Sequence, residues 1–230
     1  MSESILIKRR QILAAAIAAP FAALTLPTYA NGPRTRDWRA VLLDRDRYLE
    51  LERPQSGEKA SFCYYRRGKG WDTRGYNIAC NILRDVESKK VVQISPKLID
   101  LLFLQVAWLR MNNLPSKLII NSGYRTAAFN ASLEGAAKDS MHVHARAADI
   151  KIPGVETEQI AKLAKAIGVG GVGVYPAKEF IHVDIGKVRS WRVGQYAPHE
   201  ESWLAAYDNQ EIDQALHSIE GPGTGRIIYG

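Results

Sequence analysis

The chain has 230 residues, of which 46% are apolar, and a formal net charge of +7. This length fits one ordinary domain with extensions, and the apolar fraction is large enough to supply a core. A positive surplus fits nucleic acid, an anionic membrane, an acidic cell-wall polymer, or a solvated surface with no specific partner. Because no run of basic residues is interleaved with aromatic residues, we expect no nucleic-acid partner.

Residues 1–30 have the order of a targeting segment and are expected to be removed from the folded protein. The basic residues 8–10, with paired arginines, precede a mildly apolar run over 14–26, and the small residue Ala30 closes the segment. This order resembles a twin-arginine export signal, with a general secretory signal or an uncleaved anchor as the alternative. The run is too short and too rich in alanine for a stable membrane span. An export signal implies that the mature protein lies in the periplasm, and we expect it to be a monomer.

Cys63 and Cys80 are the two cysteines of the chain. In an oxidising compartment an even pair can form a disulfide, and two small buried thiols are the alternative. The sequence leaves both interpretations open. Neither cysteine has the close partner that a zinc knuckle uses, so a metal role is not expected for them.

The first part of the exported chain predicts a β-hairpin followed by a helix. Residues 31–47 are polar and charged, which predicts an irregular lead-in. Residues 48–52 and 59–66 are expected to be strands, joined by the turn-forming residues 54–57. Apolar residues at helical spacing then predict a helix over 77–88.

The middle of the chain contains the clearest helix signal. Ser95 is a capping residue, and Pro96 suits the first helical position. Apolar residues then recur at steps of three and four as far as Leu109. A short strand over 117–120 and a helix over 127–133 are expected to follow.

Two later strands each carry polar groups within segments that otherwise suit burial. In residues 147–152, Asp149 points away from the face that carries the apolar residues. In residues 180–185, His182 and Asp184 lie opposite the apolar residues. Neighbouring strands of this kind would carry a carboxylate and an imidazole on one shared face.

The segments between and after these strands have a structural interpretation. A helix over 157–167 is expected, with Thr157 as its cap and Gly168 ending it. The glycine-rich residues 170–176 lack the ending of a phosphate loop and predict a strand that another chain segment approaches closely. Residues 192–230 are a polar C-terminal tail with a further helix expected within it.

His142, in the loop before the first of the two strands, completes a set with Asp149 and His182. Two histidines and a carboxylate, with a fourth position left for water, are typical of a catalytic zinc site. The alternative is ordinary hydrogen-bonded side chains on two polar strand faces. The order of elements predicts an α+β domain, with a small antiparallel sheet carrying the zinc site and helices packed on its other face. No Gly-x-Ser-x-Gly elbow supports a serine hydrolase.

The motif Ser140-x-His142-x-x-Ala145-x-Ala147-x-Asp149, followed by His182-x-Asp184, carries a family resemblance. It resembles the zinc peptidases of the D-alanyl-D-alanine carboxypeptidase, lysostaphin and hedgehog superfamily, and within them the murein endopeptidase K branch. Ala145 stands where that family's motif has glycine. Further shared segments are residues 122–125, 171–176, 180–186 and 189–191. The resemblance covers residues 48–191, which we take as the zinc peptidase domain.

The resemblance implies a zinc peptidase that hydrolyses peptide cross-links of peptidoglycan by a metal-activated water. Glu179, three residues before His182, matches the position of the acidic base in carboxypeptidases of the superfamily. Asp184 competes for that role, or orients His182 as a hydrogen-bond partner. Arg125 would stabilise an oxyanion or bind a substrate carboxylate, with a surface salt bridge as the alternative. Ser140 would bind substrate or cap the loop.

Two other functions remain open at this point. One is a non-catalytic module of the same fold that binds cell wall or a protein, and the other is a D-Ala-D-Ala carboxypeptidase. The residues do not specify which cross-link is cut.

Overall fold

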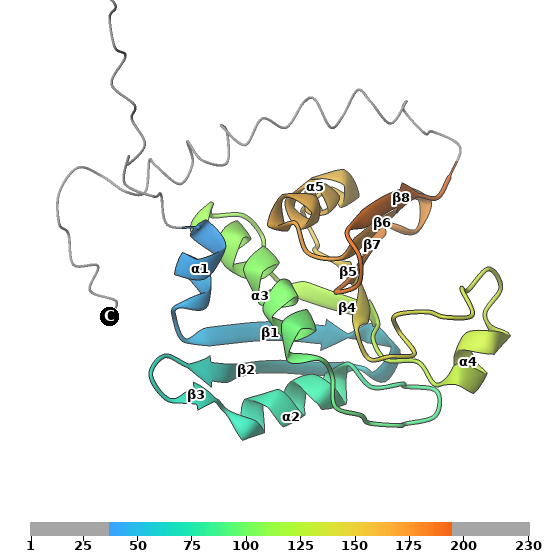
Figure 1. Ribbon diagram of the computed structural model, residues 1–230, viewed down its shortest axis with the longest axis horizontal. Coiled ribbons are helices and arrows are strands. Elements are labelled where there is room, and N and C mark those ends of the chain that lie inside the picture. Colours follow the sequence, from blue (N-terminus) through green and yellow to red (C-terminus); the bar gives the residue numbers. More distant parts are fainter. Residues whose placement is uncertain (1–36, 195–230) are drawn as a thin grey trace, which may run out of the picture. The chain divides into compact units, whose positions relative to one another are not determined.

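The computed structural model describes residues 37–194 (Figure 1). The predicted export signal over 1–30 and most of the C-terminal tail, with its expected helix, lie outside the described residues. Within residues 37–194, none of the helices combines the length and the apolar character that a membrane span requires.

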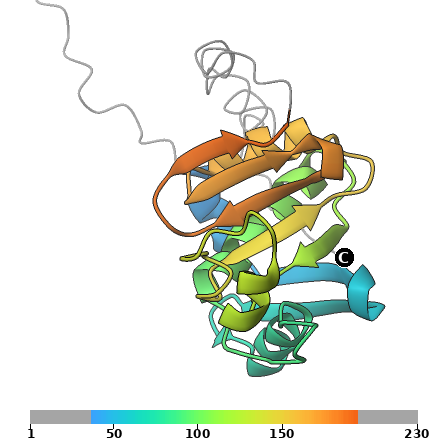
Figure 2. The same ribbon diagram turned by 90° about the vertical axis from the view of Figure 1, so that its right-hand side faces the viewer.

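Eight strands form one sheet in the order β3-β2-β1-β4-β5-β7-β6-β8. Figure 2 shows this order from β8 at the top to β1 and β2 near the bottom. The strands are β1 (Arg47–Arg53), β2 (Glu58–Arg66), β3 (Gly70–Trp71), β4 (Leu118–Ser122), β5 (Ala147–Lys151), β6 (Gly171–Tyr175), β7 (Phe180–Asp184) and β8 (Arg189–Arg192).

The predicted α+β class is confirmed, but the sheet is larger than expected and it is mixed. Neighbouring strands are antiparallel except in the pairs β1–β4 and β6–β8, which are parallel. A parallel pair needs a long crossover between its strands. Residues 54–117 form the crossover between β1 and β4. The connection from β6 to β8 runs through β7, which follows β6 and precedes β8 along the chain.

Three of the helices pack together over the sheet, and a fourth packs on the hairpin. Helices α1 and α5 both contact α3, α5 also contacts β6 and β7, and α2 contacts β2. Helix α4 lies apart from them, at the right of Figure 1. The helices are α1 (Trp38–Leu43), α2 (Thr73–Ile82), α3 (Pro96–Met111), α4 (Ala127–Ser132) and α5 (Thr157–Ile167).

The alternation predicted for β5 and β7 places one face of each strand in the core. Ile150, Ile181 and Val183 belong to the same buried cluster as the side chains of α3 and α5. Because side chains alternate along a strand, Asp149 and His182 point to the face of the sheet that those helices do not cover. The sheet therefore separates the apolar core from a polar face.

Two expectations near the N-terminus were wrong. The lead-in is not irregular throughout, because residues 38–43 form α1, where the Asp37 side chain accepts a hydrogen bond from the Arg39 backbone N–H. Helix α2 begins at Thr73 rather than residue 77, because Asp72 caps it by accepting a hydrogen bond from the Gly75 N–H. It ends at Ile82, ahead of a turn that the Asp85 carboxylate closes.

The signals at the other helix ends were partly confirmed. Helix α3 begins at Pro96, and Ser95 occupies the capping position without a side-chain hydrogen bond. Glu156, not Thr157, is the residue that precedes α5. Gly168 ends that helix in the left-handed conformation, with φ of 72°, as the sequence predicted.

Both cysteines are free thiols. Cys80 is buried within the core, whereas Cys63 is half-buried. Phe62 and Tyr64, the neighbours of Cys63 in β2, also belong to the core. By strand alternation Cys63 faces away from the core and from Cys80, which explains why no disulfide joins them.

Candidate metal centre

Five residues, one from each of the adjacent strands β4, β5, β7, β6 and β8, form one row across the polar face. Ser122 pairs with Asp149, Asp149 with His182, His182 with Gly173, and Gly173 with Trp191. Residues directly opposite one another in a sheet project from the same face. The register alone therefore brings the carboxylate of β5 beside the imidazole of β7.

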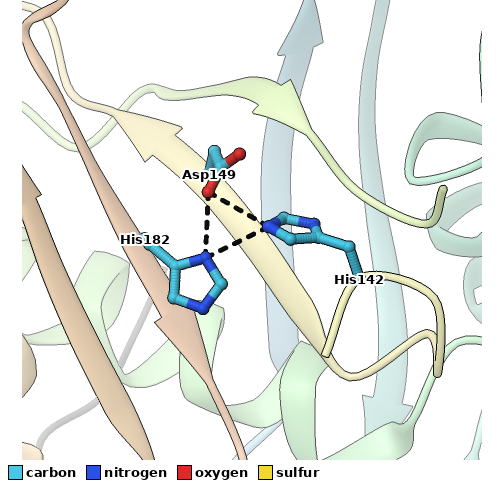
Figure 3. Close-up of side chains that lie close together, drawn as sticks. All are labelled: His142, Asp149 and His182. Atoms are coloured by element: carbon cyan, nitrogen blue, oxygen red, sulfur yellow. Dashed lines mark hydrogen bonds and ion pairs between the residues drawn. The ribbon is translucent and has the colours of Figure 1, made fainter. Parts of the chain in front are cut away.

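The three predicted metal ligands converge (Figure 3). The distance from His142 Nε2 to Asp149 Oδ1 is 3.2 Å, and from His142 Nε2 to His182 Nδ1 it is 3.1 Å. His182 Nδ1 and Asp149 Oδ1 are 3.0 Å apart. These separations approach the roughly 3.3 Å between two ligands of a tetrahedral ion whose bonds are about 2.0–2.1 Å. All three side chains are buried.

The hydrogen bonds on the outer sides of the two imidazoles define which nitrogens face the cluster as acceptors. His142 Nδ1 lies 2.6 Å from the Gly123 carbonyl oxygen, and His182 Nε2 lies 3.0 Å from Asp184 Oδ2. Because both partners accept, these two nitrogens carry the protons. His142 Nε2, His182 Nδ1 and Asp149 Oδ1 are then three acceptors facing one another. A cation at their centre satisfies all three, so the cluster fits a metal ion.

A short loop places His142 in this position. The Ser140 hydroxyl accepts a hydrogen bond from the His142 N–H, and the Ala145 N–H donates to the His142 carbonyl oxygen. The Arg125 N–H donates to the same carbonyl oxygen. Ser140 therefore caps the loop, which was one of the two roles considered for it. Ala145 has φ of 57°, a left-handed conformation that explains why the family motif carries glycine there.

Asp184 lies behind His182, on the side away from the cluster. Its side chain is fully buried, with Oδ2 near His182 Nε2 and 2.7 Å from Arg189 Nη2. Oδ1 accepts hydrogen bonds from the backbone N–H groups of Gly171 and Gly186. A Cβ atom at Gly171 would lie 2.5 Å from Asp184 Oδ2, so only glycine leaves room for this carboxylate. The arrangement favours a role in orienting His182.

Arg125 lies beside Asp149 of the cluster rather than in a surface salt bridge. Its Nη2 is 2.5 Å from Asp149 Oδ2, its Nε donates to the Ser122 hydroxyl at 2.8 Å, and its side chain is only 15% exposed. The register between β4 and β5 shifts between Ile120 and Ser122. This bulge turns Ser122 to the polar face, as bulges beside functional sites commonly do. Arg125 thus holds one oxygen of Asp149 and leaves the other to the cluster.

The cluster also determines the ionisation of its members. Burial alone would raise the pKa of Asp149, but His142 and His182 outweigh it and hold that pKa well below its usual value. Burial lowers the pKa of His142, which keeps the imidazole neutral near pH 7. Burial opposes protonation of His182 as well, but hydrogen bonds to Asp149 and Asp184 raise its pKa. Metal binding and protonation therefore compete at His182.

Glu179 precedes β7, the strand that carries His182, and is exposed to solvent. It follows the short 3₁₀-helix η2 (Pro176–Lys178), adopts a left-handed conformation with φ of 53°, and forms an ion pair with Lys151. Its side chain is 69% exposed. Within residues 37–194, no hydrogen bond or ion pair joins Glu179 to His142, Asp149 or His182.

Trp191, for which the sequence predicts no role, ends the row across the sheet. Its ring centroid lies 5.2 Å from that of His182, and its indole N–H donates to the Tyr175 hydroxyl at 3.1 Å. A Cβ atom at Gly173 would lie 2.5 Å from the Trp191 ring. Gly173, within the glycine-containing strand β6, was the signal that could have indicated this contact, because only glycine lets the indole lie across the neighbouring strand.

Comparison with known proteins identifies the family. The family model described as peptidoglycan L,D-endopeptidase MepK matches residues 43–191. The chain belongs to this family. Peptidoglycan L,D-endopeptidase MepK of Escherichia coli K12 is 33% identical over 188 residues, which cover 80% of this chain and 96% of that relative. A probable peptidoglycan L,D-endopeptidase MepK of Haemophilus influenzae is 31% identical over 156 residues, covering 66% of this chain and 82% of the relative.

Proposed function

We propose that this protein is a zinc-dependent peptidoglycan L,D-endopeptidase. Such an enzyme hydrolyses the bond between the carbonyl group of an L-configured centre and the amino group of a D-configured centre. Membership of the family supports the substrate and the bond. The observation that carries the metal-dependent chemistry is the convergence of three buried acceptor atoms, from His142, Asp149 and His182.

Zinc is proposed because two imidazoles and one carboxylate with tetrahedral spacing are its typical ligands in hydrolases. His142 Nε2, Asp149 Oδ1 and His182 Nδ1 would hold the ion. A zinc ion held there would supply a water of lowered pKa and would polarise the scissile carbonyl group. Asp184 keeps the His182 ring in the orientation and tautomer that direct Nδ1 to the ion.

Arg125 is proposed to bind the oxygen on which negative charge develops. A guanidinium has five N–H donors, and the contacts with Asp149 and Ser122 use two of them. The remaining donors lie beside a metal ligand, where a substrate oxygen would approach. Ser140 is proposed as a second substrate contact, because its hydroxyl proton stays available while its oxygen accepts the His142 N–H.

Glu179 is proposed as the general base. Of the two carboxylates considered for this role, Asp184 is separated from the cluster by the imidazole of His182, and its oxygens are occupied by four other groups. Glu179 is exposed, and its left-handed backbone departs from the strand geometry that would direct it to the core. Its pKa is lowered by the hydrogen bond with Lys151, so the carboxylate is ionised at neutral pH.

The proposed organisation of the chain follows from the sequence pattern. Residues 1–30 would direct export to the periplasm by the twin-arginine route, residues 48–191 would form the catalytic domain of a monomer, and residues 192–230 would be a tail. Helix α1 and the residues that follow it lead into the catalytic domain. Peptidoglycan peptide stems would be the partner, consistent with the basic surplus.

Digestion of purified cross-linked muropeptides, followed by mass spectrometry, tests the proposed function. We expect two fragments whose summed mass exceeds that of the substrate by one water, one of them ending in the carboxyl group of the L-configured centre and the other in the freed amine of the D-configured centre. A chelator should abolish these fragments, and one equivalent of zinc should restore them. Fragments from a D,D bond, removal of a terminal D-alanine alone, or cleavage that resists the chelator would contradict the proposal. Binding to muropeptides without any cleavage would favour the non-catalytic alternative.

A further inference from the structure

A second row of side chains lies on the polar face, one step along the strands from the metal cluster. Lys151 is two residues beyond Asp149 in β5, and Phe180 is two residues before His182 in β7. Residues two apart on a strand share a face and lie about 6.6 Å from each other. Tyr175 pairs with Phe180, and their rings stack with centroids 4.5 Å apart and planes 15° apart. The row thus combines a cation with an aromatic floor.

The ammonium group of Lys151 is held by one exposed carboxylate. Glu179 is its ion-pair partner, and the Lys151 side chain is 35% exposed while that of Glu179 is 69% exposed. Ion pairs between exposed side chains contribute little to stability. A carboxylate that arrives with other favourable contacts can therefore take the place of Glu179 at little cost.

Lys151 differs from the two arginines described beside the cluster in the exposure of its partner. Arg125 contacts Asp149 and is proposed to bind the developing oxyanion, and Arg189 contacts Asp184 behind His182. Both of those arginines contact carboxylates that are buried. Lys151 instead contacts a side chain on the rim, which positions its ammonium group to meet a ligand that enters from solvent.

The bond assigned to this enzyme places a carboxyl group within reach of such a cation. The D-configured carbon that bears the leaving amine also bears a carboxyl group, as in every α-amino acid. Where the cross-link uses that amine, this carboxyl group is either free or amidated. A free carboxylate there is attached to the carbon next to the scissile nitrogen. The backbone of Lys151 lies one strand step, about 6.6 Å, from that of Asp149, and its long side chain extends from there.

We propose that Lys151 is a specificity-determining residue that binds this free carboxylate in exchange for Glu179, with Phe180 and Tyr175 as the floor of the subsite. The assignment rests on the proposed endopeptidase function. Exchange at Lys151 also releases Glu179, the proposed base, when a substrate with the correct carboxylate is bound. The enzyme would then prefer cross-links whose carboxyl group is free over those in which it is amidated.

Hydrolysis of two matched cross-linked peptides, one with the free carboxylate and one with the amide, tests the preference. We expect the wild-type protein to favour the free acid roughly tenfold in kcat/KM, as for one partly exposed charge-assisted contact. Lys151→Met should lose that preference, because kcat/KM falls for the acid, which loses its partner, and stays level or rises for the amide, since Glu179 is no longer held. Lys151→Arg should retain most of the preference. Lys97→Met, at an exposed position of α3, is the matched control and should behave as wild type.

Calorimetric binding of the corresponding D-amino-acid fragments, as acid and as amide, separates this proposal from the proposed function. If cleavage is absent but the acid fragment binds in a manner that requires Lys151, the subsite stands and the endopeptidase assignment falls. If cleavage occurs and Lys151→Met changes both substrates equally, or neither, the subsite is overturned while the function stands. Equal unfolding midpoints of the variants would show that folding is not the cause.

Discussion

Replacing His182 with alanine is expected to lower kcat/KM for muropeptide cleavage by about a thousandfold or more, ~4 kcal/mol of transition-state stabilisation. The substitution removes one of three converging ligand atoms, Nδ1, and leaves His142 and Asp149 as an incomplete pair. Elemental analysis should find the bound metal reduced from one equivalent to a small fraction. Steady-state kinetics on the same preparation measures the loss of turnover.

The His182 variant is expected to stay folded, because Asp184 keeps three of its partners. Arg189 and the N–H groups of Gly171 and Gly186 still satisfy the buried carboxylate. His144→Ala is the matched control, since His144 is an exposed histidine near the same loop and pairs with Asp139. Wild-type kinetics and metal content in the His182 variant, or an equal loss in the His144 variant, would remove His182 from the site.

Replacing Glu179 with glutamine is expected to lower kcat by about a hundredfold to ten-thousandfold, the usual contribution of a general base. The amide keeps the size of the side chain and cannot accept a proton. Because Glu179 contacts none of the three ligand side chains among residues 37–194, the metal content should stay at the wild-type value. Kinetics over a range of pH, with metal analysis, measures both effects.

The pH dependence of the rate provides a second test of Glu179 as the base. In the free enzyme Lys151 lowers the pKa of Glu179, so the acidic limb of kcat/KM for the wild-type protein lies below the ordinary range of a glutamate. That acidic limb should be absent from the residual activity of the glutamine variant. Glu87→Gln, in the exposed turn after α2, is the control and should match wild type. A glutamine variant with full activity would exclude Glu179 and return the base assignment to Asp184 or to another group.

The sequence was sufficient to predict the metal cluster because strand alternation and a short motif carry that information. Asp149 and His182 each interrupt an apolar strand, and the register of β5 and β7 places them directly opposite each other. The loop position of His142 came from the motif. The role of Asp184 was left open, because its partners Gly171, Gly186 and Arg189 come from other segments whose approach no local pattern reveals.

Other features depend on backbone detail that composition does not encode. The left-handed conformation at Glu179 decides which way its carboxylate points, and a regular strand would have directed it to the core. The bulge before Ser122 likewise reverses the face of that residue. Lys151 was overlooked because a lysine at a strand end is ordinary until its neighbours on the same face are known.

Anomalous diffraction at the zinc absorption edge, from crystals grown with one equivalent of zinc, tests the central claim most directly. The predicted result is a single peak at about 2.0–2.2 Å from His142 Nε2, Asp149 Oδ1 and His182 Nδ1. An anomalous peak at another place in the protein, or no peak between these three side chains in crystals that contain one equivalent of zinc, would contradict the account.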